Sequence, residues 1–215
     1  MIIGINGKIG AGKDTVGTII QGLLLTNKNQ SSEIKKFAGK LKQIASILTG
    51  IPVENFEDQE FKTTLLDVEW GTVQDVPLNS IPPFADIQFN VMMSVREFLQ
   101  RLGTEAMRDG LHTNVWCNAL FADYNPGYTI SPLDVDNQAP DNWIITDMRF
   151  PNEMEAVVKK GGITIRVVRP GTVVGEHPSE TALDKTTFDY EIINDGTMEE
   201  LVKKVREILV LEELI

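Results

Sequence analysis

The chain has 215 residues, a formal net charge of −11 and a sequence pI of about 4.7, a length that suits one α/β domain with an inserted lid, or barely two small domains. The acidic balance argues against a nucleic-acid partner, because non-specific binding to a phosphate backbone needs a basic surface. No apolar run is long enough to cross a membrane, and no basic or cleavable segment precedes the first predicted strand, so we expect a cytoplasmic protein without a membrane partner.

The first 20 residues combine a short apolar run, a glycine-rich turn and a helical pattern. The apolar run (2–5) suits a buried strand, GKIGAGKDT (7–15) follows it, and helical spacing of apolar residues extends over 13–25. Strand, Gly-x-x-x-x-Gly-Lys and helix form the pattern of a phosphate-binding loop, whose backbone N–H groups and lysine contact the phosphates of a nucleotide. The alternative is a glycine-rich turn that only joins strand to helix. The residues expected to bind the nucleotide are Gly7, Gly10, Ala11, Gly12, Lys13, Asp14 and Thr15.

One position departs from the usual motif. The residue after Lys13 is normally Ser or Thr, whose hydroxyl holds Mg²⁺, whereas this chain has Asp14 followed by Thr15. A carboxylate can reach the metal through water, so Asp14 is a candidate Mg²⁺ ligand. The replacement argues against a GTPase or a motor ATPase, which need that hydroxyl on the metal. The pattern resembles that of the nucleoside monophosphate kinases.

Strand-like and helix-like stretches alternate along the rest of the chain. The predicted strands are 33–38, 143–146, 163–168 and 191–193, and the predicted helices are 39–48, one beginning after Ser94, 114–124, 151–160 and one beginning at Thr197. This alternation predicts an α/β fold with a P-loop NTPase-like, mainly parallel sheet and helices on both faces. The stretch 53–90 has no clear pattern, and we interpret it as an insertion near the substrate site, with a peripheral decoration as the alternative. The single cysteine, Cys117, excludes an internal disulfide.

The helix after Ser94 carries a polar stripe. Glu97, Arg101, Thr104 and Arg108 fall at i, i+4, i+7 and i+11, which places them on one face of an α-helix. Two arginines and a hydroxyl suit an anionic ligand, whereas the alternative is a solvated face with an ion pair between Glu97 and Arg101. The apolar face of the same helix is expected to be buried and comprises Val95, Phe98, Leu99, Leu102 and Ala106.

Further candidate site residues follow the predicted strands. Asp147 and Arg149 come after one strand, and Arg169 comes directly after the next. Parallel α/β sheets bind ligands beyond the carboxyl ends of their strands, so these residues and the phosphate-binding loop should meet at one edge. Asp147 is a candidate Mg²⁺ ligand through water, or alternatively a cap for the turn that follows it. The arginines that can hold a second phosphate are concentrated in the middle third of the chain or just after it: Arg96, Arg101, Arg108, Arg149, Arg166 and Arg169.

The chain resembles the phage-type deoxynucleoside monophosphate kinases in six segments that occur in the same order. They are GKIGAGKDT (7–15), LQRLGTEAMRD (99–109), VWCNALF (115–121), TDMRFPNE (146–153), IRVVRPG (165–171) and YEIINDGT (190–197). A further stretch, HPSETAL (177–183), is similar to the lid sequence of that family. Only the first segment is diagnostic alone, whereas the ordered set extends from end to end of the chain, with gaps at about 52–92 and 125–142.

The resemblance implies one kinase domain over 1–215 that transfers the γ-phosphate of ATP, with Mg²⁺, to a deoxynucleoside 5′-monophosphate (dNMP). It implies that the loop binds the donor phosphates, that 169–188 forms a closing lid, which would include His177, and that 52–92 covers the acceptor base. The candidate substrate residues are Arg96, Arg101, Thr104, Arg108 and Arg149. The candidate catalytic residues are Lys13, Arg101, Asp147, Arg149 and Arg169. The turn beside the adenine would be Asn194, Asp195 and Gly196.

Two other functions stay open from the sequence. The arginines cannot distinguish a nucleotide phosphate from another phosphate, so a kinase of another small phosphorylated metabolite, such as dephospho-coenzyme A, is one alternative. A nucleotide-binding regulatory protein without turnover is the other, although a pure sensor needs no second phosphate site. The base specificity and the oligomeric state are open, a homodimer included, and a virus-encoded kinase of this type would work in the host cytoplasm.

Overall fold

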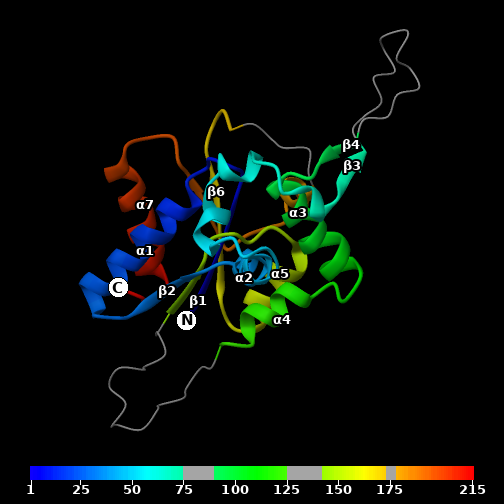
Figure 1. Cartoon of the computed structure of the whole chain (residues 1–215). Helices are drawn as coiled ribbons and strands as arrows, with labels where there is room; N and C mark the ends of the chain where they lie inside the picture. Colours follow the sequence, from blue (N-terminus) through cyan, green and yellow to red (C-terminus); the bar gives the residue numbers. More distant parts are fainter. Residues whose placement is uncertain (75–89, 125–141, 173–177) are drawn as a thin grey trace. The chain divides into compact units, whose positions relative to one another are not determined.

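The computed structural model describes residues 1–74, 90–124, 142–172 and 178–215 (Figure 1). The described chain divides into two compact units, of which the first comprises Met1–Gly39 with Trp116–Ile215 and the second comprises Lys40–Val115. Helix α2 (Phe37–Thr49) begins in the first unit and continues into the second. The described part of the predicted insertion at 52–92 belongs to the second unit.

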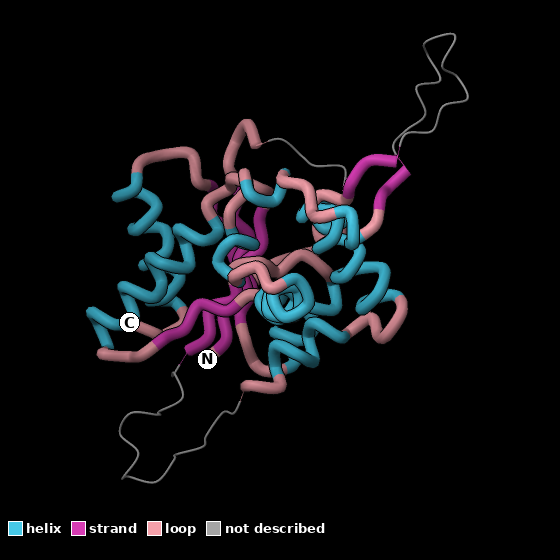
Figure 2. Tube along the Cα trace, in the orientation of Figure 1, coloured by secondary structure: helices cyan, strands magenta, loops and turns pink. Residues whose placement is uncertain are grey.

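A parallel sheet forms the centre of the first unit. Among the described residues, five strands pair in the order β2-β5-β1-β6-β7, and every neighbouring pair is parallel. Figure 2 shows the strands of this sheet in magenta between helices. The strands are β1 (Ile2–Gly7), β2 (Ser32–Lys35), β5 (Asn142–Ile145), β6 (Ile163–Val168) and β7 (Tyr190–Ile193). Since the helices between them lie on both faces, the predicted α/β class with a P-loop NTPase-like sheet is confirmed.

Two apolar layers cover the sheet because successive side chains of a strand point to opposite faces. Helices α1 (Lys13–Lys28) and α7 (Met198–Leu211) lie side by side on one face, where they pack on Ile3 and Ile5 of β1 (Figure 1). On the other face, Ile2 and its neighbours pack against α4 (Val115–Phe121) and α5 (Pro151–Lys159). Both layers leave the carboxyl ends of the strands open for the connecting loops.

Most element boundaries agree with the sequence prediction, and the exceptions have local causes. Helix α2 begins two residues earlier than predicted, at Phe37, because the carboxylate of Asp147 accepts its first backbone N–H groups. Helix α1 continues to Lys28, and α4 ends at Phe121, before the predicted position 124. Helix α7 begins after Thr197, whose side chain forms the expected capping box with Glu200. In the part of the chain that is described, no helix is long and apolar enough to span a membrane.

The second unit has an apolar core of its own. Besides the rest of α2 it contains η1 (Val53–Glu57), η2 (Phe61–Thr63), η3 (Val68–Trp70), β3 (Thr72–Gln74), β4 (Asn90–Met92), α3 (Val95–Gln100) and η4 (Arg101–Asp109). The described part of the stretch that had no clear sequence pattern, 53–74, consists mainly of short 3₁₀ helices, which are too short to show a period. Its backbone is held to the start of α3 by a hydrogen bond from Val95 N to Thr64 O at 2.9 Å. Trp70 packs edge-on against Phe98, with 5.1 Å between the ring centroids.

The helix after Ser94 changes its winding at Arg101. It is α-helical over Val95–Gln100 and π-helical over Arg101–Asp109, where the hydrogen bonds span five residues. A wider helix turns less per residue, so the predicted single stripe is wrong beyond Arg101, and Thr104 and Arg108 are rotated away from it. The same change leaves Ala106 exposed, although the α-helical pattern placed it on the buried face.

Candidate functional site

The loop after β1 has the backbone of a phosphate-binding loop. Gly12 has φ +98° at the position before α1, a left-handed conformation that L side chains rarely adopt. Gly7 lies so close to the neighbouring strand that a Cβ there would approach Val167 O to 2.5 Å. Ala11 is buried, and its N–H donates to Lys8 O at 3.1 Å, which closes the loop on itself. The glycines that the motif requires are therefore explained by backbone geometry.

Lys13 lies at the first position of α1, over this loop. Its ammonium donates to Lys8 O at 3.0 Å, a carbonyl of the loop itself. Burial, followed by the positive charge of Arg149, lowers the pKa of Lys13 from its ordinary value. The carboxylates of Glu180, Asp14 and Asp147 act in the opposite direction. Lys13 is thus a partly desolvated cation that an anionic ligand would stabilise.

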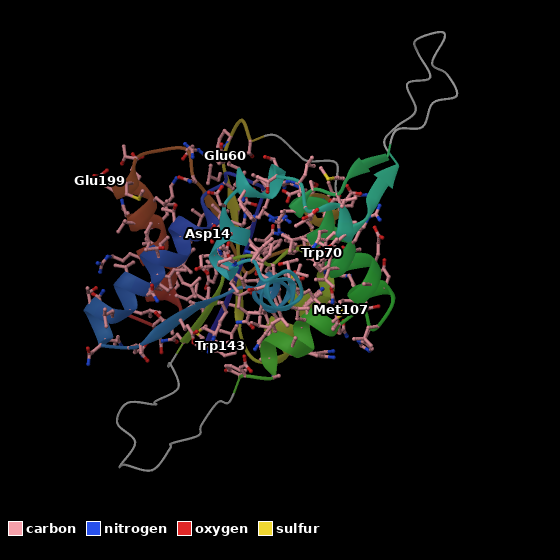
Figure 3. All side chains as sticks on the ribbon, in the orientation of Figure 1. Asp14, Glu60, Trp70, Met107, Trp143 and Glu199 are labelled. Carbon is pink, nitrogen blue, oxygen red and sulfur yellow. The ribbon has the colours of Figure 1, made fainter. Side chains whose placement is uncertain are left out.

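Asp14 faces the end of β5 and stays accessible. Its Oδ1 accepts a hydrogen bond from Thr146 Oγ1 at 2.7 Å and lies 3.6 Å from Lys36 Nζ, yet 70% of the side chain is exposed (Figure 3). Thr15 is half-buried beside it. Within the described ranges, no three His, Cys, Asp or Glu side chains are grouped closely enough to hold a metal ion by themselves. Mg²⁺ usually keeps several waters and uses one or two carboxylates with substrate phosphates, and the exposed Asp14 carboxylate fits that donor set.

Asp147 caps the first turn of α2. Its Oδ1 accepts the N–H of Phe37 at 2.7 Å and its Oδ2 accepts the N–H of Ala38 at 2.9 Å. The capping role that the sequence allowed as an alternative is present, at a helix 110 residues earlier rather than at the following turn. A role of Asp147 in Mg²⁺ binding stays a prediction.

Arg149 forms an ion pair with Glu180 of α6 (Pro178–Thr181). The backbone of Arg149 is fixed by its own N–H, which donates to Glu153 Oε2 at 2.7 Å. Glu180 also accepts the N–H of Ile9, a residue of the phosphate-binding loop, at 3.3 Å. Lys8 of the same loop contacts the carbonyl of Glu180 and the carboxylate of Asp184. Arg149 and the loop are therefore linked through one segment, 180–184.

The turn after β7 contacts the loop from the other side. Asn194 N donates to Val168 O at 2.7 Å, and Asn194 Nδ2 donates to Ala11 O at 2.9 Å. Asp195 lies 2.9 Å from Lys204 Nζ, and this hydrogen bond lowers the pKa of the Asp195 carboxyl. Gly196 precedes the cap of α7 and lies against the Glu200 side chain. The turn thus combines a contact to the loop with an ion pair to the final helix.

The remaining candidates lie elsewhere. Arg169 is exposed just after β6. In the second unit, Arg96 Nη2 donates to Gln59 Oε1 at 3.3 Å, and Arg101 forms the expected pair with Glu97 at 3.2 Å. Thr104 and Arg108 are half-buried in η4. The predicted lid residue His177 lies outside the described residues.

At the edge of the first unit, hydrogen bonds connect the loop with Thr146, Glu180 and Asn194. Sequence reasoning did not single out Lys8, Thr146, Glu180 or Asp184. Their contacts with the segment 7–15 span 132 to 176 positions of sequence, as for Thr146 with Asp14 and Lys8 with Asp184. Lys8, Thr146, Glu180 and Asp184 lie in segments that the sequence analysis had identified, but no local period or spacing predicts which of their residues make such pairs.

A parallel sheet whose first strand leads through a glycine-rich loop into a helix that begins with lysine defines a P-loop nucleotide-binding protein. The family model described as "Deoxynucleotide monophosphate kinase" matches residues 56–205 of the chain. The chain therefore belongs to the deoxynucleotide monophosphate kinase family.

Three similar proteins come from phages. A deoxynucleotide monophosphate kinase of Enterobacteria phage T4 is 31% identical over 153 residues, which cover 71% of this chain and 56% of the phage protein. A deoxynucleoside-5′-monophosphate kinase of Escherichia phage T5 is 24% identical over 234 residues, covering 90% of this chain and 89% of that protein. The deoxynucleotide monophosphate kinase of Escherichia phage RB69 is 31% identical over 121 residues, or 56% of this chain and 46% of that protein. The chain thus spans about half the length of the T4 and RB69 relatives and most of the T5 relative.

Proposed function

We propose that the protein transfers the γ-phosphate of ATP to a dNMP, giving ADP and the deoxynucleoside diphosphate. The observation that carries this proposal, beside family membership, is the link between Arg149 and the phosphate-binding loop. Glu180 pairs with the Arg149 guanidinium through Oε1 and accepts the N–H of Ile9, a loop residue, through Oε2 at 3.3 Å. The charge of Arg149 also acts to lower the pKa of Lys13, the lysine at the end of that loop. Two cations around one position suit a phosphoryl group in transfer, whose charge is spread over three oxygens.

The donor side of the reaction needs positioning rather than covalent chemistry from the protein. The N–H groups of the loop from Gly7 to Gly12 hold the phosphates, and Lys13 neutralises the oxygens next to the bond that breaks. Asn194 supports the loop through Ala11, and the turn that it begins lies where the adenine would bind. Asp14, with Asp147 as the second candidate, would hold Mg²⁺ through water, and the ion would supply positive charge to the phosphate oxygens.

The acceptor side is proposed to be built from arginines. Arg149 would contact the group in transfer, because it already faces the loop. Arg96 and Arg101 would hold the phosphate of the dNMP, since guanidinium groups bind phosphate oxygens in pairs. The acceptor oxygen attacks the γ-phosphorus and the bond to the ADP oxygen breaks, so the negative charge passes to ADP. Arg169 would neutralise that charge from the end of β6.

A coupled ADP-release assay tests the function. It would use ATP, Mg²⁺ and a panel of dAMP, dGMP, dCMP, dTMP, the corresponding ribonucleotides and dephospho-coenzyme A. Turnover with one or more deoxynucleotides is expected and would also reveal the base preference. Turnover only with another phosphorylated metabolite, or none while ATP binds, would replace the proposal by a metabolite kinase or by a regulatory protein.

The surroundings of the protein follow from the same proposal. A dNMP kinase encoded by a virus works in the host cytoplasm, where ATP and deoxynucleotides are available. The net charge of −11 favours small-molecule substrates over nucleic acid, because a surface of this sign repels a phosphate backbone. Light scattering coupled to gel filtration would establish whether the protein is a monomer or a homodimer.

A further inference from the structure

The carboxylate of Glu180 occupies an unusual position for an acidic group. Only 5% of its side chain is exposed, and its two oxygens contact groups that a phosphate-binding site uses. Oε1 is paired with the guanidinium of Arg149, and Oε2 accepts the N–H of Ile9 in the phosphate-binding loop at 3.3 Å. A loop N–H and a guanidinium are the donors that bind phosphate oxygens, so Glu180 presents a carboxylate where an anionic ligand is expected.

Lys13 belongs to the same arrangement. Burial and the charge of Arg149 lower its pKa, and Glu180 contributes the largest effect in the opposite direction. The Glu180 carboxylate thus contacts two donors, Ile9 N–H and Arg149, and its charge acts on Lys13.

We propose that Glu180 takes the place of the transferred phosphate when no ATP is bound, and that ATP displaces it. The inference rests on the proposed function for the choice of phosphate, because only the group in transfer contacts both the donor loop and Arg149. A carboxylate and a phosphate share the same preference for charged N–H donors, so their binding to these groups is mutually exclusive. When ATP is absent, Glu180 thus supplies the negative charge that the loop N–H groups and the Arg149 guanidinium would otherwise lack.

The segment that carries Glu180 is fixed at its C-terminal end. Leu183, three residues on, is 2% exposed in the core of the first unit, and Arg166 donates to its carbonyl. Asp184 is held by Lys8. Displacement of Glu180 by movement of α6 (Pro178–Thr181) would also break the contact of Lys8 with the Glu180 carbonyl, while Leu183 stays in the core. ATP binding would in this way be coupled to the position of α6.

Two substitutions test the proposal by isothermal titration calorimetry with ATP and with ADP. Glu180→Gln removes the charge, and Glu180→Asp keeps the charge but shortens the side chain so that it cannot contact Ile9 and Arg149 together. Both variants should bind ATP about threefold to tenfold more tightly than the wild type, because the competing anion no longer occupies the site. Binding of ADP, which lacks the transferred phosphate, should change by less than about twofold. Glu191→Gln, on an exposed residue of β7, is the matched control for loss of one charge and should change neither affinity.

Three results would overturn the proposal. Weaker ATP binding in both variants would make Glu180 a positioning residue for Arg149. If Glu180→Gln bound ATP more tightly but Glu180→Asp bound it with wild-type affinity, the effect would be one of general electrostatics. If both variants bound ATP and ADP more tightly to the same extent, Glu180 would not occupy the position of the transferred phosphate. Failure of the kinase function is a separate result: absence of turnover with every acceptor would leave the ATP titrations fully interpretable. Circular dichroism of both variants would verify that they are folded, and Glu180→Asp keeps the test valid if Glu180→Gln is not.

Discussion

The carboxylate of Asp147 accepts the backbone N–H of Phe37 at 2.7 Å, across 110 positions of sequence. Its second oxygen accepts the N–H of Ala38 at 2.9 Å, so one side chain satisfies two of the donors that a helix start leaves without partners. This cap sets where α2 begins and attaches it to the end of β5. Negative charge at this end of α2 is also favoured by the helix dipole.

Asp147→Ala should lower the free energy of unfolding by about 1–2 kcal/mol, because two N–H groups at the start of α2 lose their acceptor. Urea denaturation measures the change. Asp147→Asn keeps one acceptor oxygen and should lose less. Glu191→Ala, on an exposed residue of β7, is the control and should leave stability within about 0.5 kcal/mol. Wild-type stability in Asp147→Ala would contradict the cap, and an increased Mg²⁺ requirement of Asp147→Asn would assign the residue a second role at the metal.

Lys13→Ala should reduce kcat by about 10²–10³-fold or more while the fold stays intact, because the variant loses the charge that stabilises the transferred group. The measurement is the coupled ADP-release assay, with circular dichroism for the fold. Lys28→Ala, in the exposed last turn of α1, is the matched control and should keep full activity. Substantial residual turnover in Lys13→Ala would remove Lys13 from the assigned role.

Arg101→Ala should raise the Michaelis constant for the acceptor far more than that for ATP, since Arg101 is assigned to the acceptor phosphate. Glu97→Gln is a sharp control, because it breaks the same exposed ion pair and leaves the guanidinium in place. Exposed pairs of this kind contribute about 0–1 kcal/mol, so both variants should be nearly as stable as the wild type. Equal effects of Arg101→Ala on both Michaelis constants would place Arg101 outside the acceptor site.

Lys204→Met should return the pKa of the Asp195 carboxyl toward its ordinary value of 3.8, because the hydrogen bond from Lys204 is the largest cause of the lowered pKa. A carboxyl whose folded pKa lies below its unfolded value stabilises the fold above the unfolded value, and this contribution is lost as the pH falls through the folded value. Carbon-detected NMR titration of Asp195 in both proteins measures the shift. An unchanged titration curve in Lys204→Met would show that Lys204 does not set it.

The sequence was sufficient for the parts of the site that depend on local chain geometry. The loop at 7–15 could be predicted because strand, glycines and lysine follow one another directly, and the cap at Thr197 because its partner is three residues away. The role of Asp147 at α2 and the contact of Glu180 with Ile9 depend on the order of strands in the sheet. The local periodicity of apolar residues does not predict that order. The π-helical winding from Arg101 was missed for a different reason: an α-helical period was assumed where the hydrogen bonds span five residues.

A comparison of Gly12 with Gly10 separates the cost of backbone strain from the cost of a steric clash with Asn194. Gly12 has φ +98°, and a Cβ there would lie 2.6 Å from Asn194 Nδ2, whereas Gly10 has φ +78° and open space around its Cα. Gly10→Ala should therefore carry only the backbone cost of about 1–2 kcal/mol, and Gly12→Ala should carry that cost plus the clash. We expect Gly12→Ala to bind ATP more weakly than Gly10→Ala in calorimetric titrations.

The double variant Gly12→Ala with Asn194→Ala completes a double-mutant cycle that measures the coupling of these two positions in ATP binding. Removal of the Asn194 amide relieves the clash but also deletes its hydrogen bond to Ala11 O, so Asn194→Ala alone should weaken ATP binding through a less fixed loop. The double variant should lose less ATP affinity than the sum of the losses in the two single variants, because the relief of the clash offsets part of the effect of the lost hydrogen bond. Strict additivity would mean that the loop adapts to a Cβ at position 12 without pressing on Asn194, and that its conformation is held by other contacts.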